Sequence, residues 1–180
     1  MAKQLTIFVE NRAGRLKSIS ENLRKSGIDI RAFTIQDRGD YGLLKLIVNK
    51  PNDAYLALAD LGCACALKDI LAVSVPDQPG NFHKLTSALA DNGINVKDAY
   101  GFVLQPQQTG VCCMEIEQPL LTKATKIAQD AGFAVLEDEE LYSLSPMYVL
   151  RVCEVHDYED DCSFCVPRHF LLFAFLLSHA

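Results

Sequence analysis

The chain has 180 residues, of which 49% are hydrophobic and 22% charged, a balance typical of a folded globular protein. Its formal net charge of −6 argues against nonspecific nucleic-acid binding, which needs a basic surface. No apolar run approaches the roughly 20 residues of a transmembrane helix, and no signal-peptide h-region precedes the first strand. The seven cysteines are an odd number without disulfide-scaffold spacing, so we expect a cytoplasmic protein that does not contact a membrane.

The first 68 residues predict the element order βαββαβ. An alternating apolar strand leads into a turn at Gly14, and the helix that follows carries apolar residues at i, i+3 and i+7. A hairpin turn at residues 38–40 joins two further strands, of which the second is apolar at nearly every position and is therefore expected to be central. The predicted elements are strands at 3–9, 28–37, 43–48 and from 64, and helices from Gly14 to Gly27 and from Pro51 to Gly62.

The same pattern recurs 66 positions later, without a gap, over residues 5–33. The loop Glu10-Asn11-Arg12-Ala13-Gly14-Arg15-Leu16 aligns with Pro76-Asp77-Gln78-Pro79-Gly80-Asn81-Phe82. The helix positions Leu16, Ile19 and Leu23 align with Phe82, Leu85 and Leu89. A single offset over this length indicates an internal duplication. In the second copy the hairpin is longer by two residues, and the last strand is predicted at 133–136 and 141–142.

We therefore predict an α+β protein of two ferredoxin-like βαββαβ units, with antiparallel sheets side by side and helices on one face. The domains are expected at residues 1–68 (repeat one) and 69–144 (repeat two), with a C-terminal extension of unknown role at 145–180. No flexible linker separates the repeats, so a fixed pair is expected. Residues 1–68 carry eleven Lys and Arg against seven Asp and Glu, whereas residues 69–144 carry four against eleven. Opposite charges on the two repeats could help them dock, but solvated surface gives the same count and is the interpretation that we prefer.

The repeated loop is a Gly-containing turn between a strand and a helix. The first N–H groups of a helix lack intrahelical acceptors and, with the positive end of the helix dipole, suit a carboxylate or phosphate. A nearby side chain such as Asn11 or Asp77 offers an acceptor for an ammonium group. Together these features suit a free amino acid as the ligand. An ordinary helix start with Asn or Asp in its turn would explain the same residues without a ligand.

Each loop is followed by a Gly-Ile-Asx-aliphatic segment, Gly27-Ile28-Asp29-Ile30 and Gly93-Ile94-Asn95-Val96. With these segments, residues 3–144 closely resemble two copies of the ACT domain, a small-molecule-sensing module of amino-acid metabolism. The resemblance implies a non-catalytic regulatory protein that binds a free amino acid at the interface of paired ACT domains and needs no cofactor or metal. It also implies a homodimer and, as a further partner, a metabolic enzyme.

The expected ligand-binding residues come from both copies of the loop and from the Asx position after each helix. Repeat two keeps the complete Asp77-Gln78-Pro79-Gly80 turn and Asn95, so it is the favoured site. The residues are Asn11, Arg12, Ala13, Gly14, Arg15, Leu16, Asp29, Asp77, Gln78, Pro79, Gly80, Asn81, Phe82 and Asn95.

Other functions remain open at this stage. A structural interaction module could pair a sheet edge with another subunit. An RNA-binding RRM shares the element order, but the third-strand positions that should hold stacking aromatics carry Leu43 and Lys45, or Leu44 and Leu46. Enzyme motifs such as a P-loop, H-E-x-x-H or G-x-S-x-G are missing from the sequence. A zinc site could be sought at Cys153, Cys162, Cys165 and His169, although an appended extension explains these residues better.

Overall fold

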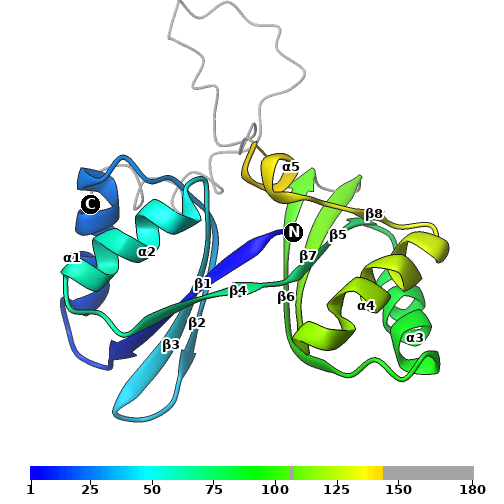
Figure 1. Ribbon diagram of the computed structural model, residues 1–180, viewed down its shortest axis with the longest axis horizontal. Helices are drawn as coiled ribbons and strands as arrows, with labels where there is room; N and C mark the ends of the chain where they lie inside the picture. Colours follow the sequence, from blue (N-terminus) through cyan, green and yellow to red (C-terminus); the bar gives the residue numbers. More distant parts are fainter. Residues whose placement is uncertain (106–107, 144–180) are drawn as a thin grey trace, which may run out of the picture. The chain divides into compact units, whose positions relative to one another are not determined.

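The computed structural model describes residues 1–105 and 108–143 (Figure 1). All of these residues belong to one compact unit. Repeat one comprises β1 Lys3–Glu10, α1 Arg15–Lys25, β2 Ile30–Asp37, β3 Tyr41–Val48, α2 Pro51–Asp60 and β4 Cys65–Asp69. Repeat two comprises β5 Leu71–Pro76, α3 Asn81–Asp91, β6 Val96–Gln105, β7 Thr109–Ile116, α4 Gln118–Asp130, β8 Ala134–Val135 and α5 Asp138–Ser143.

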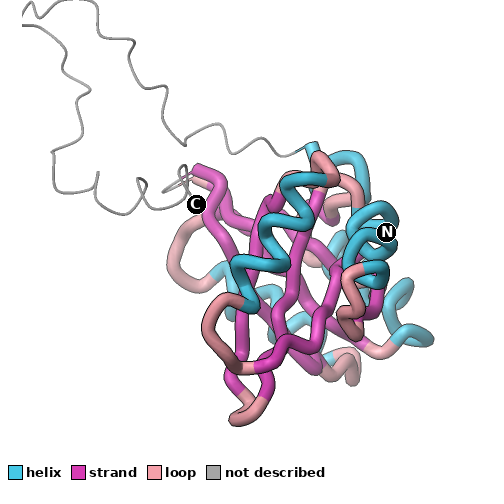
Figure 2. The backbone as a smooth tube through the Cα atoms, turned by 90° about the vertical axis from the view of Figure 1, so that its left-hand side faces the viewer, coloured by secondary structure: helices cyan, strands magenta, loops and turns pink. Residues whose placement is uncertain are grey.

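Each repeat forms its own four-stranded antiparallel sheet, in the order β2-β3-β1-β4 and β6-β7-β5-β8. The apolar strand β3 is central, as predicted. In each repeat the two long helices, α1 and α2 or α3 and α4, run across one face of the sheet (Figure 1 and Figure 2). The predicted α+β fold of two ferredoxin-like units is confirmed; the boundaries at residues 68 and 144 stay a prediction.

Two of the three hydrophobic clusters lie between a sheet and its own helices. In repeat one, Ile19 and Leu23 of α1 pack with Leu5 and Ile7 of β1. In repeat two, Leu85 and Leu89 of α3 take the equivalent places against β5. The helix periodicity therefore predicted the core positions, except that its first members, Leu16 and Phe82, are exposed. Both of these side chains lie at a helix start.

The third cluster is shared by the two repeats. Its buried residues come from the helix-free faces of both sheets and from the segments beside them: Ala2, Ile47, Ile70, Ala72, Val111, Cys113 and Leu141. The two sheets were expected to lie side by side. The structure adds that each sheet buries its helix-free face against the other repeat, a face that two sheets joined only at their edges would leave in water. For the same reason β1, whose alternating pattern is typical of a strand with one face in water, is buried on both faces, including Gln4 and Thr6.

Polar contacts also join the repeats, and they correct the interpretation of the charge asymmetry as solvated surface alone. The ammonium group of Lys45 on β3 pairs with Asp98 on β6, and the Gln36 side-chain amide donates to the same carboxylate at 3.2 Å. Lys68 lies 2.6 Å from Glu115. In both ion pairs the lysine belongs to the basic repeat and the carboxylate to the acidic repeat, so part of the asymmetry is complementarity across the interface.

The end of repeat two differs from the sequence prediction. Leu141 and Tyr142, predicted as part of the last strand, lie in helix α5, while β8 is only two residues long. Leu141 enters the shared cluster, and the Tyr142 hydroxyl accepts a hydrogen bond from the Lys3 backbone N–H at 2.7 Å. Burying Leu141 over the shared core explains why a helix replaces the strand here. The extension and its Cys153, Cys162, Cys165 and His169 lie outside the described residues.

None of the helices within residues 1–143 combines the length and apolar character needed to traverse a bilayer. The same part of the chain holds no group of three His, Cys, Asp or Glu residues placed to bind a metal ion. Cys63, Cys112 and Cys113 are buried free thiols.

Cys113 makes the stability of the shared core depend on pH. Burial raises the pKa of this thiol to about 12 from its ordinary value of 9.0. Because the folded pKa lies above the unfolded one, this stabilising term is complete below pH 9 and is lost as pH rises toward 12. The free energy of unfolding should therefore fall above pH 9, by up to about 1.4 kcal/mol per pH unit for one thiol.

Urea unfolding at several pH values between neutrality and pH 10.5 measures this loss. Cys113→Ala should be less stable at neutral pH, because it leaves a cavity, but should show a flatter decline in alkali. An equal decline in the variant and the wild type would contradict this assignment.

Candidate functional site

The strand-to-helix loop has the same hydrogen bonds in both repeats. The N–H of Asn11 donates to the carbonyl of Asp40 at 3.0 Å, and the N–H of Asp77 donates to that of Gln108 at 3.1 Å. Further equivalent bonds are Arg12 N to Glu10 O, Arg15 N to Arg12 O and Ser18 N to Gly14 O in repeat one, and Gln78 N to Pro76 O, Asn81 N to Gln78 O and Lys84 N to Gly80 O in repeat two. The duplicated sequence thus builds one loop conformation twice, anchored to the adjacent hairpin.

A glycine precedes each helix in a backbone conformation that other residues rarely adopt. Gly14 has φ +85° and Gly80 has φ +93°, and neither α1 nor α3 receives a side-chain cap. A Cβ atom at either position would meet nothing within 4 Å, so the requirement for glycine is conformational rather than steric. In α3 the N–H groups of Phe82 and His83 belong to the first turn and lack an intrahelical acceptor.

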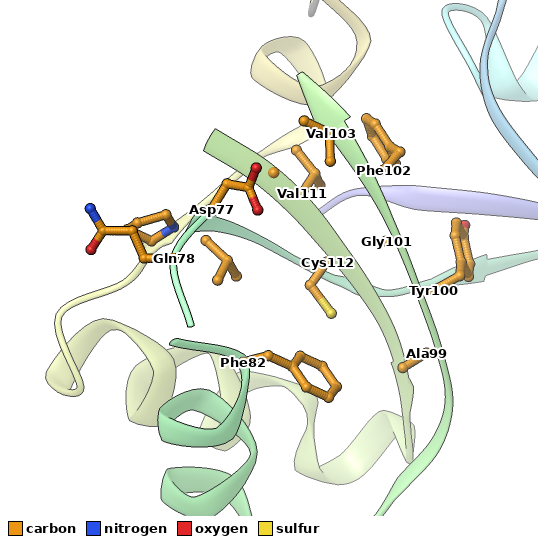
Figure 3. A pocket seen from close by; sticks show the side chains of 13 residues that line it. Asp77, Gln78, Phe82, Ala99, Tyr100, Gly101, Phe102, Val103, Val111 and Cys112 are labelled. Atoms are coloured by element: carbon orange, nitrogen blue, oxygen red, sulfur yellow. The ribbon is translucent and has the colours of Figure 1, made fainter. Parts of the chain in front are cut away.

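A hollow of about 400 Å³ lies beside this loop in repeat two. Its lining residues, which define the repeat-two hollow, are Val75, Pro76, Asp77, Gln78, Phe82, Ala99, Tyr100, Gly101, Phe102, Val103, Gly110, Val111 and Cys112. Figure 3 shows the Phe82 ring from the start of α3 facing Ala99 on β6, with the Cys112 sulfur directed toward the ring and the Gln78 side chain turned away. The hollow therefore opens between a helix start and the edge strand β6.

A smaller hollow of about 260 Å³ occupies the equivalent place in repeat one. Its lining residues, which define the repeat-one hollow, are Val9, Glu10, Asn11, Arg12, Arg15, Leu16, Ile35, Gln36, Asp37 and Gly42. The duplication offset, with the two-residue hairpin insertion, maps nine of these ten onto residues that line the repeat-two hollow. The exception is Arg15, which maps onto Asn81.

The repeat-one hollow is narrowed by Ile35, one of two bulky side chains on β2 that face the helix side of the sheet. Phe33 and Ile35 on β2 pair with Leu46 and Leu44, so they point to the helix side of the sheet. The side chain of Ile35 lies 3.6 Å from the place that a Cβ of Gly42 would occupy. The equivalent residues in repeat two are Ala99 and Gly101, which pair with Met114 and Cys112. Repeat two therefore leaves open a space that repeat one partly fills.

The structure brings together some of the predicted site residues but not others. Asp77, Gln78 and Phe82 line the repeat-two hollow, and Asn11, Arg12, Arg15 and Leu16 line the repeat-one hollow. The loop residues Ala13, Gly14, Pro79, Gly80 and Asn81 shape the turn without lining either hollow.

Several predicted polar side chains have structural partners. Asn11 donates to the Gly39 carbonyl at 2.9 Å and to an Asp37 carboxylate oxygen at 3.4 Å, so its amide braces the hairpin. Asn81 donates to the Pro76 carbonyl at 3.2 Å. Arg12 pairs with Glu10 at 2.6 Å.

The two Asx positions after the helices lie apart from the hollows. Asp29 pairs with Arg31 at 3.0 Å, and neither Asp29 nor Asn95 lines a hollow. Both residues are exposed and precede the edge strands β2 and β6. These two predicted ligand-binding residues are thus not part of either hollow within one chain.

Sequence reasoning missed the residues on β6 and β7. Ala99, Gly101, Gly110 and Cys112 line the repeat-two hollow, yet they belong to no motif that was singled out. Extending the 66-residue offset beyond residue 33 would have aligned Gly101 with Ile35 and indicated that the two copies differ at this position.

The wall of the repeat-two hollow is nonpolar. Burial raises the pKa of the Cys112 thiol to about 11, so this group is a neutral thiol at physiological pH. His83, on the first turn of α3, is exposed and lies 3.5 Å from the Ser87 hydroxyl. Among the described residues lining the hollow, Asp77 is the one with an ionisable carboxylate.

Comparisons with known proteins agree with this architecture. Residues 1–144 match the family described as ACT domain pair. The crystal structure of protein BT0572 from Bacteroides thetaiotaomicron is similar with a TM-score of 0.73 and 30% identity, over 79% of this chain and 96% of that one.

Two further crystal structures share the fold. The ligand-free regulatory subunit of aspartate kinase from Thermus thermophilus is similar with a TM-score of 0.55 and 17% identity, over 73% of this chain and 93% of that one. The corresponding subunit from Thermus flavus has a TM-score of 0.51 and 17% identity, over 72% and 91%. A comparison with curated proteins gives no match. The chain belongs to the ACT domain pair family.

Proposed function

We propose that this protein is a non-catalytic sensor that binds a free amino acid in the repeat-two hollow. The observation that carries the proposal is the position of that hollow, between the start of α3 and the edge strand β6. The N–H groups of Phe82 and His83 would receive the ligand carboxylate, where the helix dipole favours negative charge. The Asp77 carboxylate would receive its ammonium group.

Repeat two is the better candidate for binding. Its hollow is larger and is lined by Ala99 and Gly101, whereas Ile35, at the position equivalent to Gly101, lines the smaller hollow of repeat one. A volume of about 400 Å³ lies within the range of small-molecule sites in proteins, about 300–1,000 Å³. The hollow adjoins β6, an edge strand among the described residues, so a second copy of the chain would complete it. We therefore expect a homodimer whose assembly depends on the ligand.

The regulated partner would be a metabolic enzyme. The Thermus thermophilus protein with the same fold is by its name the regulatory subunit of an aspartate kinase, which supports a role of this kind.

A structural interaction module is the second candidate, and one observation favours it. Phe33 and Ile35 on edge strand β2 are 61% and 46% exposed, and Leu16 beside them is 47% exposed. Exposed apolar side chains at a sheet edge are typical of surfaces that bind another protein. RNA binding is disfavoured, because the helix-free sheet face that an RRM would present holds the buried residues Lys45 and Ile47.

A thermal-shift screen of the twenty common amino acids at millimolar concentration tests the proposal. At a hundredfold excess over Kd, binding to the folded state alone stabilises it by about 2.7 kcal/mol. At least one amino acid should therefore raise the Tm, and Asp77→Ala should abolish that shift. If no amino acid shifts the wild-type Tm, the interaction module becomes the better explanation.

A further inference from the structure

Resting on the proposed function, we infer that the repeat-two hollow selects amino acids with an uncharged, apolar side chain, and that Ala99 and Gly101 are its specificity-determining residues. The two repeats provide an internal comparison. They share the loop, the helix start and the hairpin anchor, and they differ at the wall that a ligand side chain would meet.

The chemistry of that wall favours apolar atoms. Beyond the loop, the ligand side chain would contact the Phe82 ring, the Cys112 thiol and the backbone of Gly101 and Gly110. A charged side chain placed there would lose water without gaining a partner of opposite charge, which is unfavourable. Asp77, the ionisable carboxylate of the hollow, lies at the loop and is already assigned to the ligand ammonium group.

The repeat-one hollow has a different chemical character. Glu10, Arg12, Arg15 and Asp37 line it, where repeat two has Pro76, Gln78, Asn81 and Val103 at the equivalent positions. An apolar side chain entering repeat one would meet Ile35 and charged groups instead of open space. The same apolar ligand should therefore bind once per chain.

The small residues of β6 provide the room. Ala99 and Gly101 are both exposed on the helix side of the sheet, opposite the Phe82 ring in Figure 3. In repeat one the equivalent position to Gly101 is Ile35, which lines the hollow, and the equivalent position to Ala99 is Phe33, which points to the same side of its sheet. A larger side chain at position 99 or 101 would project toward the Phe82 side of the sheet. A Cβ at Gly101 would also lie 3.3 Å from the Val111 carbonyl oxygen, so this position tolerates a side chain poorly.

Isothermal titration of the full-length protein with leucine, phenylalanine, aspartate and lysine tests the inference. Leucine or phenylalanine should bind with one site per chain, at least tenfold more tightly than aspartate or lysine. Ala99→Phe, which copies the residue of repeat one, should weaken that binding at least tenfold. Position 99 is exposed and its alanine already has a Cβ, so Ala99→Phe avoids the close backbone contact that a Cβ at position 101 would make in Gly101→Ile.

The matched control is Phe33→Ala, the reverse change in repeat one, which should leave the affinity unchanged. Circular dichroism and the Tm establish that each variant is folded. Tighter binding of aspartate or lysine, or an undiminished affinity in folded Ala99→Phe, would overturn the inference while leaving amino-acid sensing intact. If none of these four amino acids binds and none of the twenty amino acids shifts the Tm in the thermal-shift screen, the proposed function itself would be overturned.

Discussion

Replacing Asp98 with Ala should lower the free energy of unfolding by about 3–5 kcal/mol, the usual cost of leaving a buried charge without its partner. Asp98 bonds to Lys45 through one carboxylate oxygen and to Gln36 through the other. Lys45 is only 5% exposed, so water cannot replace the lost carboxylate. Urea unfolding followed by circular dichroism gives the difference directly.

Two comparisons separate the ion pair from the general effect of substitution. The double variant Lys45→Met/Asp98→Leu removes both charges and should recover most of the stability, because the desolvation cost disappears with the pair. Glu117→Ala removes one partner of the exposed Lys97–Glu117 pair and should change little. An Asp98→Ala protein as stable as the wild type would show that the repeats do not depend on this contact.

Leu141→Ala should lower the free energy of unfolding by about 2–5 kcal/mol, the range for large-to-small changes in a core. Leu141 is fully buried, and it is the α5 residue that packs in the cluster shared by both repeats. Thermal and urea unfolding of the variant measure the loss.

Leu56→Ala on α2 is the control for this prediction. Leu56 is 61% exposed, and its truncation should change stability by no more than about 0.5 kcal/mol. If the two leucine variants had equal stability, α5 would not contribute to the shared core in the way that the structure indicates.

The fold could be predicted because local patterns agree with it twice. The 66-residue offset placed both helices and both loops, and the structure begins α1 at Arg15 and α3 at Asn81 as the offset requires. The apolar run of β3 predicted a central strand. These features depend on neighbours in the sequence, which periodicity and turn residues describe well.

The contact between the repeats could not be predicted in the same way. Lys45 and Thr6 are polar, and in a strand with alternating residues such side chains suggest a face in water. They are buried because a second sheet covers them, a tertiary contact that strand periodicity does not contain. The helical α5 was missed for a related reason, since Leu141 is fixed by the shared core rather than by its own segment.

The loop part of the candidate site was predictable, whereas its wall was not. Gly14 and Gly80 lie in the turns between strand and helix that the sequence predicted, and both have positive φ. Ala99 and Gly101 matter through the space they leave open, and small residues on a strand carry no motif. Their role becomes visible only in comparison with Phe33 and Ile35, the larger residues at the equivalent positions of repeat one.

An NMR titration of the isotope-labelled full-length protein with leucine or phenylalanine tests amino-acid binding by repeat two most directly. The account predicts the largest amide shifts at Phe82 and His83, with further shifts at Gly101 and Gly110 and little change at Leu16 and Lys17 of repeat one. Amide shifts confined to repeat one, or no shifts at millimolar ligand, would contradict it.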